Sequence, residues 1–503
     1  MMGADAEIEA LRAAVSKHFT VSQITVNPFA VAFQVTVAPD RLDASFDALR
    51  RDLVPRNYVP TIVAEPAGTV IHVQKTPERK FRGTQVNLLL LAATVGTTWV
   101  AGAVNWELYA DVPWFTLDAL VLGFVSFTVP LLLILGAHEM GHYLVAKRHS
   151  VRASLPFFIP SIPILGTFGA FISMRDPIPN RKALLEIGLA GPLIGFALAV
   201  PITVLGLFLG TQDVRPPALN GGGEITMPSL LFGWIQGFFP ATMVDPFRRH
   251  PTAFAGWVGF FVTAINLLPA GQLDGGHVAR ALFGENHRWL SYGAVLLLLV
   301  LGAFSYPGWF LFALIIMLLG TRHPPPLNDI TKLAPSRKAL GALAIAILVV
   351  TFVPTPFVEV PTEASFAFET ATAPHIVLAE LNQTIAVGAS ATISLNLNNT
   401  GNVMETVQVR IVPENLDRFG WTLTILDYTL YPAAGGSVFV PVGNRTVTIP
   451  LNVTDYATIR VQVVVPGAAA SGMYNFAVEG RIVDPARPRQ PFVIQVPVRI
   501  TVP

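Results

Sequence analysis

The chain has 503 residues, long enough for roughly two to four domains. Apolar residues make up 52% and charged residues only 13%, against about 25% in soluble domains, and the mean hydropathy is +0.55. This composition argues against a soluble globular enzyme and predicts an integral membrane protein in a lipid bilayer. The net charge of +1 argues against nucleic-acid binding. Cysteine is absent, so any metal must be held by His, Asp, Glu or backbone oxygen.

The N-terminal part has the pattern of a soluble domain. Helical and strand-like segments alternate in the order helix, strand, strand, helix, strand, strand, near residues 8–15, 21–26, 31–37, 41–53, 61–64 and 69–73. This order predicts a small α+β domain over residues 1–80, on the cytosolic side of the membrane. No secretory signal peptide is expected, because the first long apolar run starts only near residue 83.

The central part is a series of apolar runs. Six runs carry no charged residue, over residues 83–106, 119–137, 187–212, 251–273, 289–321 and 339–358. A membrane span needs ~20 such residues. The fifth run contains Pro307-Gly308, a pair that makes turns, so we expect two helices there. The sequence therefore predicts an α-helical polytopic membrane core over residues 83–358, with about seven transmembrane helices.

Two further apolar stretches, 153–174 and 225–244, contain several Pro and Gly residues. Irregular backbone within the bilayer must be surrounded by protein or by a water-filled cavity. We therefore expect each of these stretches to lie along the membrane surface or to form a re-entrant segment. With this scheme, sixteen Lys and Arg residues lie in loops on the N-terminal side and three lie in loops on the other. The positive-inside bias then predicts that the N-terminus is cytosolic and the C-terminus is outside. The expected location is a prokaryotic cell membrane.

The C-terminal part alternates apolar and polar residues between turn clusters. Strands are expected near residues 392–397, 407–412, 421–426, 446–453, 458–465, 473–480 and 492–502. Their spacing predicts a β-sandwich over residues 380–503, on the extracytoplasmic side. The stretch resembles the immunoglobulin-like surface modules of prokaryotic envelope proteins, and that resemblance implies an exterior ligand for this domain.

The segment His138-Glu139-Met140-Gly141-His142 carries the strongest chemical signal. On a helix, positions i and i+4 share one face, so both histidines can bind one Zn²⁺. Glu139 then lies beside the metal, where it can take a proton from zinc-bound water. Eight residues separate Glu139 from Lys147, which places the site ~12 Å inside the charged boundary of the helix. The alternative is a helix with two buried, hydrogen-bonded histidines.

A catalytic zinc site keeps three protein ligands and one open position. Asp274 is the expected third ligand, because its span ends on the same side of the membrane as the span of His142. Pro269 and Gly271 break the helix before it, and Gly275-Gly276 let the backbone approach closely. The alternative for Asp274 is a capping role at the start of the following helix.

Together, HExxH inside one span and the later N-x-x-P-x-x-x-L-D-G-G stretch from Asn266 to Gly276 resemble the site-2 protease family of intramembrane zinc metalloproteases. The resemblance covers residues 85–320. It implies His138, His142 and Asp274 as zinc ligands and Glu139 as the catalytic base. It also implies that Asn266 is a polar group near the active site, and that the substrate is a transmembrane segment of another protein.

The segment Gly166-Thr167-Phe168-Gly169 lies where this family has a membrane-associated strand. We expect these four residues to bind substrate by adding an unwound segment to the edge of the strand. The alternative is plain packing against neighbouring helices. No PDZ-like insertion is recognisable between the two motifs, so nothing supports substrate selection by such a domain.

Two other functions compete with this reading. A different HExxH peptidase would use a glutamate on a later helix as third ligand, but no comparable glutamate lies in the inward half of another span. A catalytically silent metal-binding scaffold or transporter would keep the zinc ligands. Such a protein would tolerate the loss of Glu139, because only hydrolysis needs a base.

Overall fold

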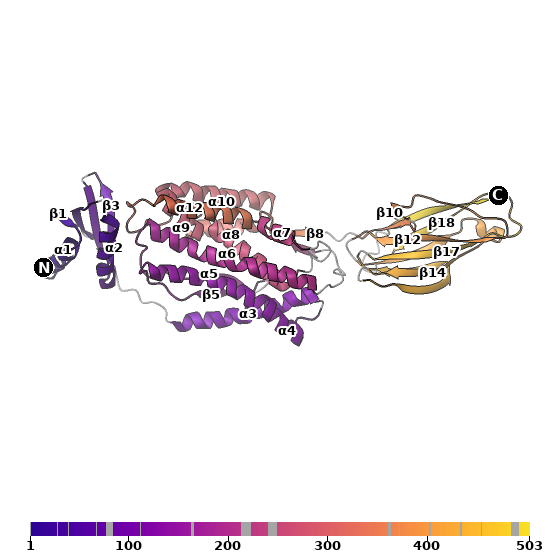
Figure 1. The fold of residues 1–503 in the computed structure, drawn as a ribbon, viewed down its shortest axis with the longest axis horizontal. Coiled ribbons are helices and arrows are strands. Elements are labelled where there is room, and N and C mark those ends of the chain that lie inside the picture. Colours follow the sequence, from indigo (N-terminus) through magenta and orange to yellow (C-terminus); the bar gives the residue numbers. More distant parts are fainter. Residues whose placement is uncertain are drawn as a thin grey trace. The chain divides into compact units, whose positions relative to one another are not determined.

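The computed structural model describes residues 2–27, 29–38, 40–66, 68–76, 84–110, 112–161, 165–212, 223–239, 249–360, 364–371, 373–401, 404–432, 435–453, 455–483 and 492–503 (Figure 1). These residues fall into two compact units. The first contains the described residues up to 212 together with 227–239 and 249–356. The second contains 223–226 and the described residues from 357 onward.

The N-terminal domain has the predicted helix and strand order. Its elements are α1 Met2–Ser16, β1 Thr20–Asn27, β2 Ala30–Thr36, α2 Leu42–Leu53, β3 Tyr58–Glu65 and β4 Gly68–Lys75. All neighbouring strands pair antiparallel in the order β1-β2-β4-β3. On α2, Phe46, Leu49 and Leu53 recur at helical spacing and are buried, so this face covers the sheet.

This domain packs directly on the ends of the membrane helices. The backbone N–H of Ile62 donates to the carbonyl of Leu327 at 2.9 Å, and the Leu327 side chain belongs to the core of the domain. The buried guanidinium of Arg50 donates to the carbonyls of His149 and Ser150, at 3.0 and 3.1 Å. Because helix α5 (Val129–Arg148) ends just before them, Arg50 places a positive charge at the negative end of that helix.

The membrane core is built from helices that lie side by side (Figure 1). They are α3 Thr84–Ala110, α4 Leu117–Gly123, a π turn at Phe124–Thr128, α5, α6 Arg181–Gln212, α7 Leu230–Gln236, α8 Pro251–Leu267, α9 Asp274–Phe283, α10 His287–Phe304, α11 Gly308–Leu319 and α12 Pro335–Thr351. Each predicted run contains a helix, and the fifth breaks between Phe304 and Gly308 as expected.

Within the described residues, four helical segments are long and apolar enough to cross a membrane: Thr84–Ala110, Leu117–Arg148, Arg181–Gln212 and Asp274–Phe304. Helices α8 and α11 are apolar but shorter. The structure therefore confirms a core of apolar helices, while the number seven for the crossings stays a prediction.

The first of the two broken stretches, 153–174, forms a hairpin and no helix. Strands β5 Phe157–Pro160 and β6 Thr167–Phe171 pair antiparallel, with an irregularity between Phe158 and Pro160. The second stretch begins in strand β7 (Gly223–Thr226) and continues into the short helix α7, and its residues from 240 to 244 lie outside the described part.

The C-terminal unit is a pair of sheets packed face to face. Strand β7 pairs with β8 Phe357–Val360. The strands that follow are β9 Phe366–Thr370, β10 Ala373–Val377, β11 Leu381–Thr384, β12 Ser390–Asn399, β13 Glu405–Val412, β14 Thr422–Tyr431, β15 Val438–Asn444, β16 Thr446–Leu451, β17 Tyr456–Val464, β18 Gly472–Ile482 and β19 Val493–Val502.

One sheet has the order β10-β9-β12-β17-β14-β15 and the other has β11-β19-β18-β13-β16. Alternate residues of both sheets share one buried core, for example Ile459 and Val461 with Val409 and Val478. All seven predicted strands are present. Strands β9, β10, β11 and β15 are additional.

Glu405 makes the stability of this sandwich depend on pH. Its side chain is 3% exposed; one carboxylate oxygen accepts the Ser365 N–H, and the other is buried without a hydrogen-bond partner among the described residues. Burial raises the pKa of Glu405 from 4.5 to about 7, although the Ser365 N–H opposes this rise. The pKa of Glu405 is higher in the folded chain than in the unfolded chain, so the folded state favours the neutral carboxyl group. The contribution of Glu405 to the stability of the sandwich is therefore complete below about pH 4.5 and is lost as the pH rises through about 7.

We predict that the Glu405→Gln variant loses this dependence, which in the wild type amounts to about 2 kcal/mol between pH 5 and pH 8. The measurement is hydrogen–deuterium exchange of β13 and β16 in the full chain, corrected for intrinsic exchange rates. Glu380→Gln, a change at a half-exposed carboxylate, is the matched control. Equal pH dependence in Glu405→Gln and the wild type would contradict the prediction.

Candidate metal centre

Helix α5 presents three chemically active side chains on a buried stretch. His138 and His142 are one turn apart and are 3% and 5% exposed, and Glu139 between them is 6% exposed. The i, i+4 spacing directs both imidazoles to the same side of the helix. Burial of three polar side chains in an apolar helix is costly unless they have partners, so their surroundings decide what they do.

Asp274 reaches this group from the first turn of α9. Between α8 and α9 the chain reverses through residues 268–273, and Gly271 there has φ +53°. At Gly275, a Cβ atom would lie 2.1 Å from the carbonyl oxygen of Leu267. Only glycine allows α9 to start this close to the end of α8, and this closeness brings Asp274 to the histidines.

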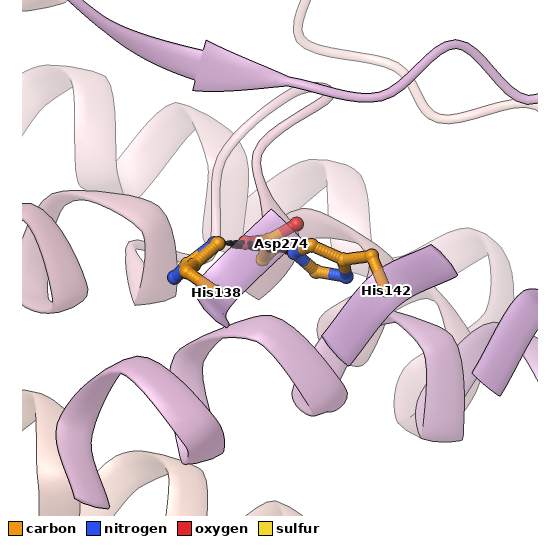
Figure 2. Close-up of side chains that lie close together, drawn as sticks. All are labelled: His138, His142 and Asp274. Atoms are coloured by element: carbon orange, nitrogen blue, oxygen red, sulfur yellow. Dashed lines mark hydrogen bonds and ion pairs between the residues drawn. The ribbon is translucent and has the colours of Figure 1, made fainter. Parts of the chain in front are cut away.

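The donor atoms of His138, His142 and Asp274 converge on one point (Figure 2). Asp274 Oδ2 lies 3.2 Å from His138 Nε2 and 3.1 Å from His142 Nε2, and the two Nε2 atoms are 3.2 Å apart. Among the described residues, this is the one group of three or more His, Asp or Glu side chains close enough to share a metal ion.

This donor set fits Zn²⁺. Nitrogen and oxygen donors at ~2.0–2.1 Å from a tetrahedral zinc are about 3.3 Å from one another, close to the three edges of this triangle. Two imidazoles and a carboxylate are ligands that zinc prefers in the absence of cysteine. Three ligands leave the fourth position open, as in catalytic rather than structural zinc sites.

His142 is held by helix α6. Its Nδ1 lies 2.7 Å from the carbonyl oxygen of Ile187, and a carbonyl only accepts, so Nδ1 carries the proton. The lone pair of His142 is therefore on Nε2, which faces Asp274. This outer contact sets both the tautomer and the orientation of the ligand.

Two further polar side chains, Glu139 and Asn266, lie next to the three donor atoms of His138, His142 and Asp274. Glu139 Oε1 is 4.0 Å from His138 Nε2, and its carboxylate accepts a hydrogen bond from the backbone N–H of Ile172, just after strand β6. Asn266, from α8, has its amide nitrogen 3.4 Å from His138 Nε2. The structure thus brings Glu139 and Asn266 together with the three donor residues.

The hairpin with the predicted substrate-binding residues packs along α3 and α5. The Gly166 carbonyl accepts a hydrogen bond of 2.6 Å from Thr97 of α3, whereas the Phe168 side chain is 79% exposed. The Thr167 hydroxyl is buried and bonded within the hairpin. At Gly169 nothing lies within 4 Å of a Cβ position. In the described part of the chain, β6 pairs only with β5, so its other edge is open.

Sequence reasoning missed the residues of α6 that make room for the ligands. A Cβ atom at Gly191 would lie 2.1 Å from His142 Nε2 and 2.7 Å from His138 Cδ2, and one at Gly195 would lie 3.2 Å from His138 Nδ1. The spacing Gly-x-x-x-Gly is a signal for close helix packing. It was present in the sequence but is common in membrane helices, so it did not point to the metal centre.

We predict that Gly191→Ala displaces both histidines and lowers zinc binding to a small fraction of the wild-type level, because its methyl group overlaps His142. Zinc per chain is measured by elemental analysis of the full chain purified in detergent. Gly96→Ala, on α3, is the matched control, because nothing lies within 4 Å of its Cβ position. Wild-type zinc content in Gly191→Ala would show that α6 does not shape the site.

Comparisons with known proteins agree with this geometry. Residues 126–304 match the model of peptidase family M50. The chain is 38% identical over 246 residues to "Probable zinc metalloprotease EGY1, chloroplastic" of Arabidopsis thaliana, covering 47% of this chain and 44% of that protein. It is 31% identical over 236 residues to "Probable zinc metalloprotease EGY2, chloroplastic" of the same plant, covering 46% and 42%. The chain thus spans less than half the length of these relatives.

Likeness to solved structures is weak. A family 123 glycoside hydrolase from Clostridium perfringens matches 28% of this chain and 27% of its own, with 10% identity and a TM-score of 0.20. A TM-score this low supports no conclusion about function or fold.

The relatives correct one prediction. A prokaryotic cell membrane was expected, with the N-terminus cytosolic and the C-terminus outside as the charge asymmetry indicates. That expectation is wrong, because these relatives are plant proteins whose names place them in the chloroplast. The names do agree with zinc as the cofactor of the His-His-Asp group. Residues 126–304 of this chain therefore match peptidase family M50, the site-2 protease family, and these plant relatives are named as zinc metalloproteases.

Proposed function

We propose that this protein is a zinc-dependent intramembrane endopeptidase that hydrolyses peptide bonds in transmembrane segments of other proteins. One observation carries the proposal: two histidines of α5 and an aspartate of α9 converge on one point, and the Glu139 carboxylate lies 4.0 Å from His138 Nε2. A metal-storage or scaffold site needs the three ligands but has no use for Glu139 at this distance.

In this proposal His138, His142 and Asp274 hold the zinc through Nε2, Nε2 and Oδ2. Zn²⁺ supplies Lewis acidity, which polarises the scissile carbonyl and lowers the pKa of water at the site to about 7. Glu139 is the general base: its carboxylate accepts the proton of the attacking water and then donates it to the leaving amine. The N–H of Ile172 orients that carboxylate.

Asn266 has a binding role in this proposal. Its amide nitrogen lies 3.4 Å from His138 Nε2, the atom through which His138 would bind zinc. The amide is then free to donate a hydrogen bond to the substrate carbonyl, where negative charge develops in the transition state.

The substrate in this proposal binds along β6. A transmembrane helix must unwind before its peptide bonds become accessible, and the unwound segment needs new partners for its backbone N–H and C=O groups. The edge of β6 that pairs with no other described strand has free backbone N–H and C=O groups that can serve as these partners. This edge lies close to Glu139, because Ile172, whose N–H donates to the Glu139 carboxylate, directly follows β6. Gly166, Phe168 and Gly169 then contact substrate through the backbone or an exposed ring, and Thr167 keeps the hairpin in shape.

We further propose seven crossings and three regions, at residues 1–80, 83–358 and 380–503, with the sandwich as a binding module for a partner on its side of the membrane. The names of the relatives favour a chloroplast membrane as the place of action.

We predict that Glu139→Gln abolishes cleavage while zinc stays bound, because glutamine keeps the shape of the side chain but cannot accept a proton. Loss of a general base costs about 10²–10⁴-fold in rate. The assay is cleavage of a panel of single-span proteins co-expressed with the chain, with zinc measured in parallel. If cleavage persists at normal zinc content, the mechanism is wrong and the silent-scaffold alternative also fails.

We predict that Asp274→Ala lowers the zinc content of the purified chain, because two imidazoles alone bind zinc more weakly than the full set. Asp118→Ala, a carboxylate on α4 away from the site, is the control. Unchanged zinc stoichiometry in Asp274→Ala would remove this residue from the ligand set.

A further inference from the structure

Helix α2 of the N-terminal domain contacts two helices of the metal centre at once. Asp43 lies in its first turn and Arg50 in its last turn. The Asp43 Oδ1 atom accepts a hydrogen bond of 2.9 Å from the side-chain amide of Asn180, directly before α6. The buried Arg50 guanidinium donates to the carbonyl of His149, directly after α5, at 3.0 Å. A single helix therefore bridges the start of α6 and the end of α5.

The charges of these two residues match the helix ends that they contact. The start of a helix carries partial positive charge, and its end carries partial negative charge. Asp43 is negative and reaches the start of α6 through Asn180, whose side-chain oxygen also accepts the Ala183 N–H. Arg50 is positive and lies at the end of α5. Both contacts are therefore electrostatically favourable.

The two contacted helices meet at one zinc ligand. His142 lies on α5, seven residues before His149. Ile187 lies on α6, seven residues after Asn180, and its carbonyl oxygen is 2.7 Å from His142 Nδ1. At 1.5 Å per residue, each contact of α2 is ~10 Å along its helix from this hydrogen bond. A shift of either helix end therefore reaches the hydrogen bond that orients His142.

Helices α5 and α6 are packed too closely to shift independently. A Cβ atom at Gly141 would lie 2.7 Å from the Ala190 carbonyl oxygen, and one at Gly191 would lie 2.1 Å from His142 Nε2. Packed interfaces of this kind change between discrete arrangements and do not deform continuously. The position that α2 gives to the two helix ends is therefore transmitted to the zinc ligands.

We propose that the N-terminal domain is energetically coupled to the metal centre, with Asp43 and Arg50 as positioning residues that hold His142 in its ligand orientation. Docking of the domain strengthens zinc binding, and by linkage zinc binding strengthens docking by the same factor. The packing of the domain therefore depends on whether zinc is bound. This coupling concerns the metal alone and does not depend on the proposed cleavage of transmembrane segments.

The first experiment measures zinc release. The full chain is purified in detergent with zinc bound, and release to an excess of chelator is followed at a temperature where circular dichroism shows the chain folded. Arg50→Gln should release zinc at least about fivefold faster than the wild type, the lower end of typical coupling between sites. Arg51→Gln is the matched control and should release zinc at the wild-type rate. Arg51 is the next residue and pairs with the same Asp47, but its side chain is 57% exposed.

Asp43→Ala removes the acceptor of Asn180 and should also speed zinc release. Its control is Asp52→Ala, at a carboxylate of the same helix that pairs with Arg56. Arg50→Lys keeps the charge but has no fork for two carbonyls, so its release rate should lie between those of Arg50→Gln and the wild type. It serves as the test if Arg50→Gln does not fold.

A second measurement separates positioning from general stabilisation. If Arg50 only stabilised the fold, Arg50→Gln would lower the thermal midpoint by the same amount with and without zinc. Coupling predicts that zinc raises the midpoint of Arg50→Gln by less than it raises that of the wild type. Equal increases in the two chains would reduce Arg50 to a structural role.

The reverse effect is measured by hydrogen–deuterium exchange of residues 42–53 in the full chain, before and after zinc is removed with a chelator. Zinc should slow this exchange in the wild type and have no effect in Asp274→Ala, which lacks one ligand. Equal zinc release by Arg50→Gln and Arg51→Gln, or exchange in α2 that does not respond to zinc, would overturn the proposal. The proposed cleavage reaction would be unaffected by that result, because none of these measurements uses a peptide substrate.

Discussion

Helix α6 passes beside the two histidines of α5 at a distance that only glycine permits, and the rest of the metal centre depends on this approach. Gly191 leaves the space that His138 and His142 occupy, and the Ile187 carbonyl, one turn earlier, directs the His142 lone pair toward Asp274. Asp274 lies 136 residues after His138 in the chain, so the site exists only when α5, α6 and α9 are packed together. Preorganised ligands of this kind need support from a second layer of contacts, and α6 provides it.

The same helices are fixed at one end by polar contacts with the N-terminal domain. Arg50 binds the carbonyls that follow α5, and the Asp43 carboxylate accepts hydrogen bonds from Asn180, which caps α6, and from Asn328. Asn328 is next to Asp329, a carboxylate shared by an arginine of α6 and an arginine of α9. The N-terminal domain therefore contacts the end of the helix of the histidines, the start of the helix that supports them and the loop that contains Asn328. It is placed to stabilise the metal centre without contacting it.

Much of this was predictable because the chemistry is local in sequence. The i, i+4 histidines define the ligand pair, and the scarcity of charge in apolar runs singled out Asp274. The N-terminal order and seven of the sandwich strands follow from alternation and helical spacing. Strands such as β11 and β15 were missed because their side chains are largely exposed, so the alternation is weak. Gly191, the Ile187 carbonyl and the shared Asp329 depend on packing between distant segments, which no local pattern reveals. The distribution of Lys and Arg predicts which side of a membrane a loop lies on, but it does not identify the membrane. The prediction of a prokaryotic cell membrane was therefore wrong.

The central claim is that His138, His142 and Asp274 form one zinc site, and zinc X-ray absorption on the full chain purified in detergent tests it most directly. The account predicts one zinc per chain, with only nitrogen and oxygen neighbours at ~2.0–2.1 Å and the scattering pattern of two imidazoles. In Asp274→Ala, one oxygen neighbour should be lost or replaced by water while both imidazoles remain. A wild-type spectrum with fewer than two imidazoles, or a chain that binds no zinc, would contradict the account.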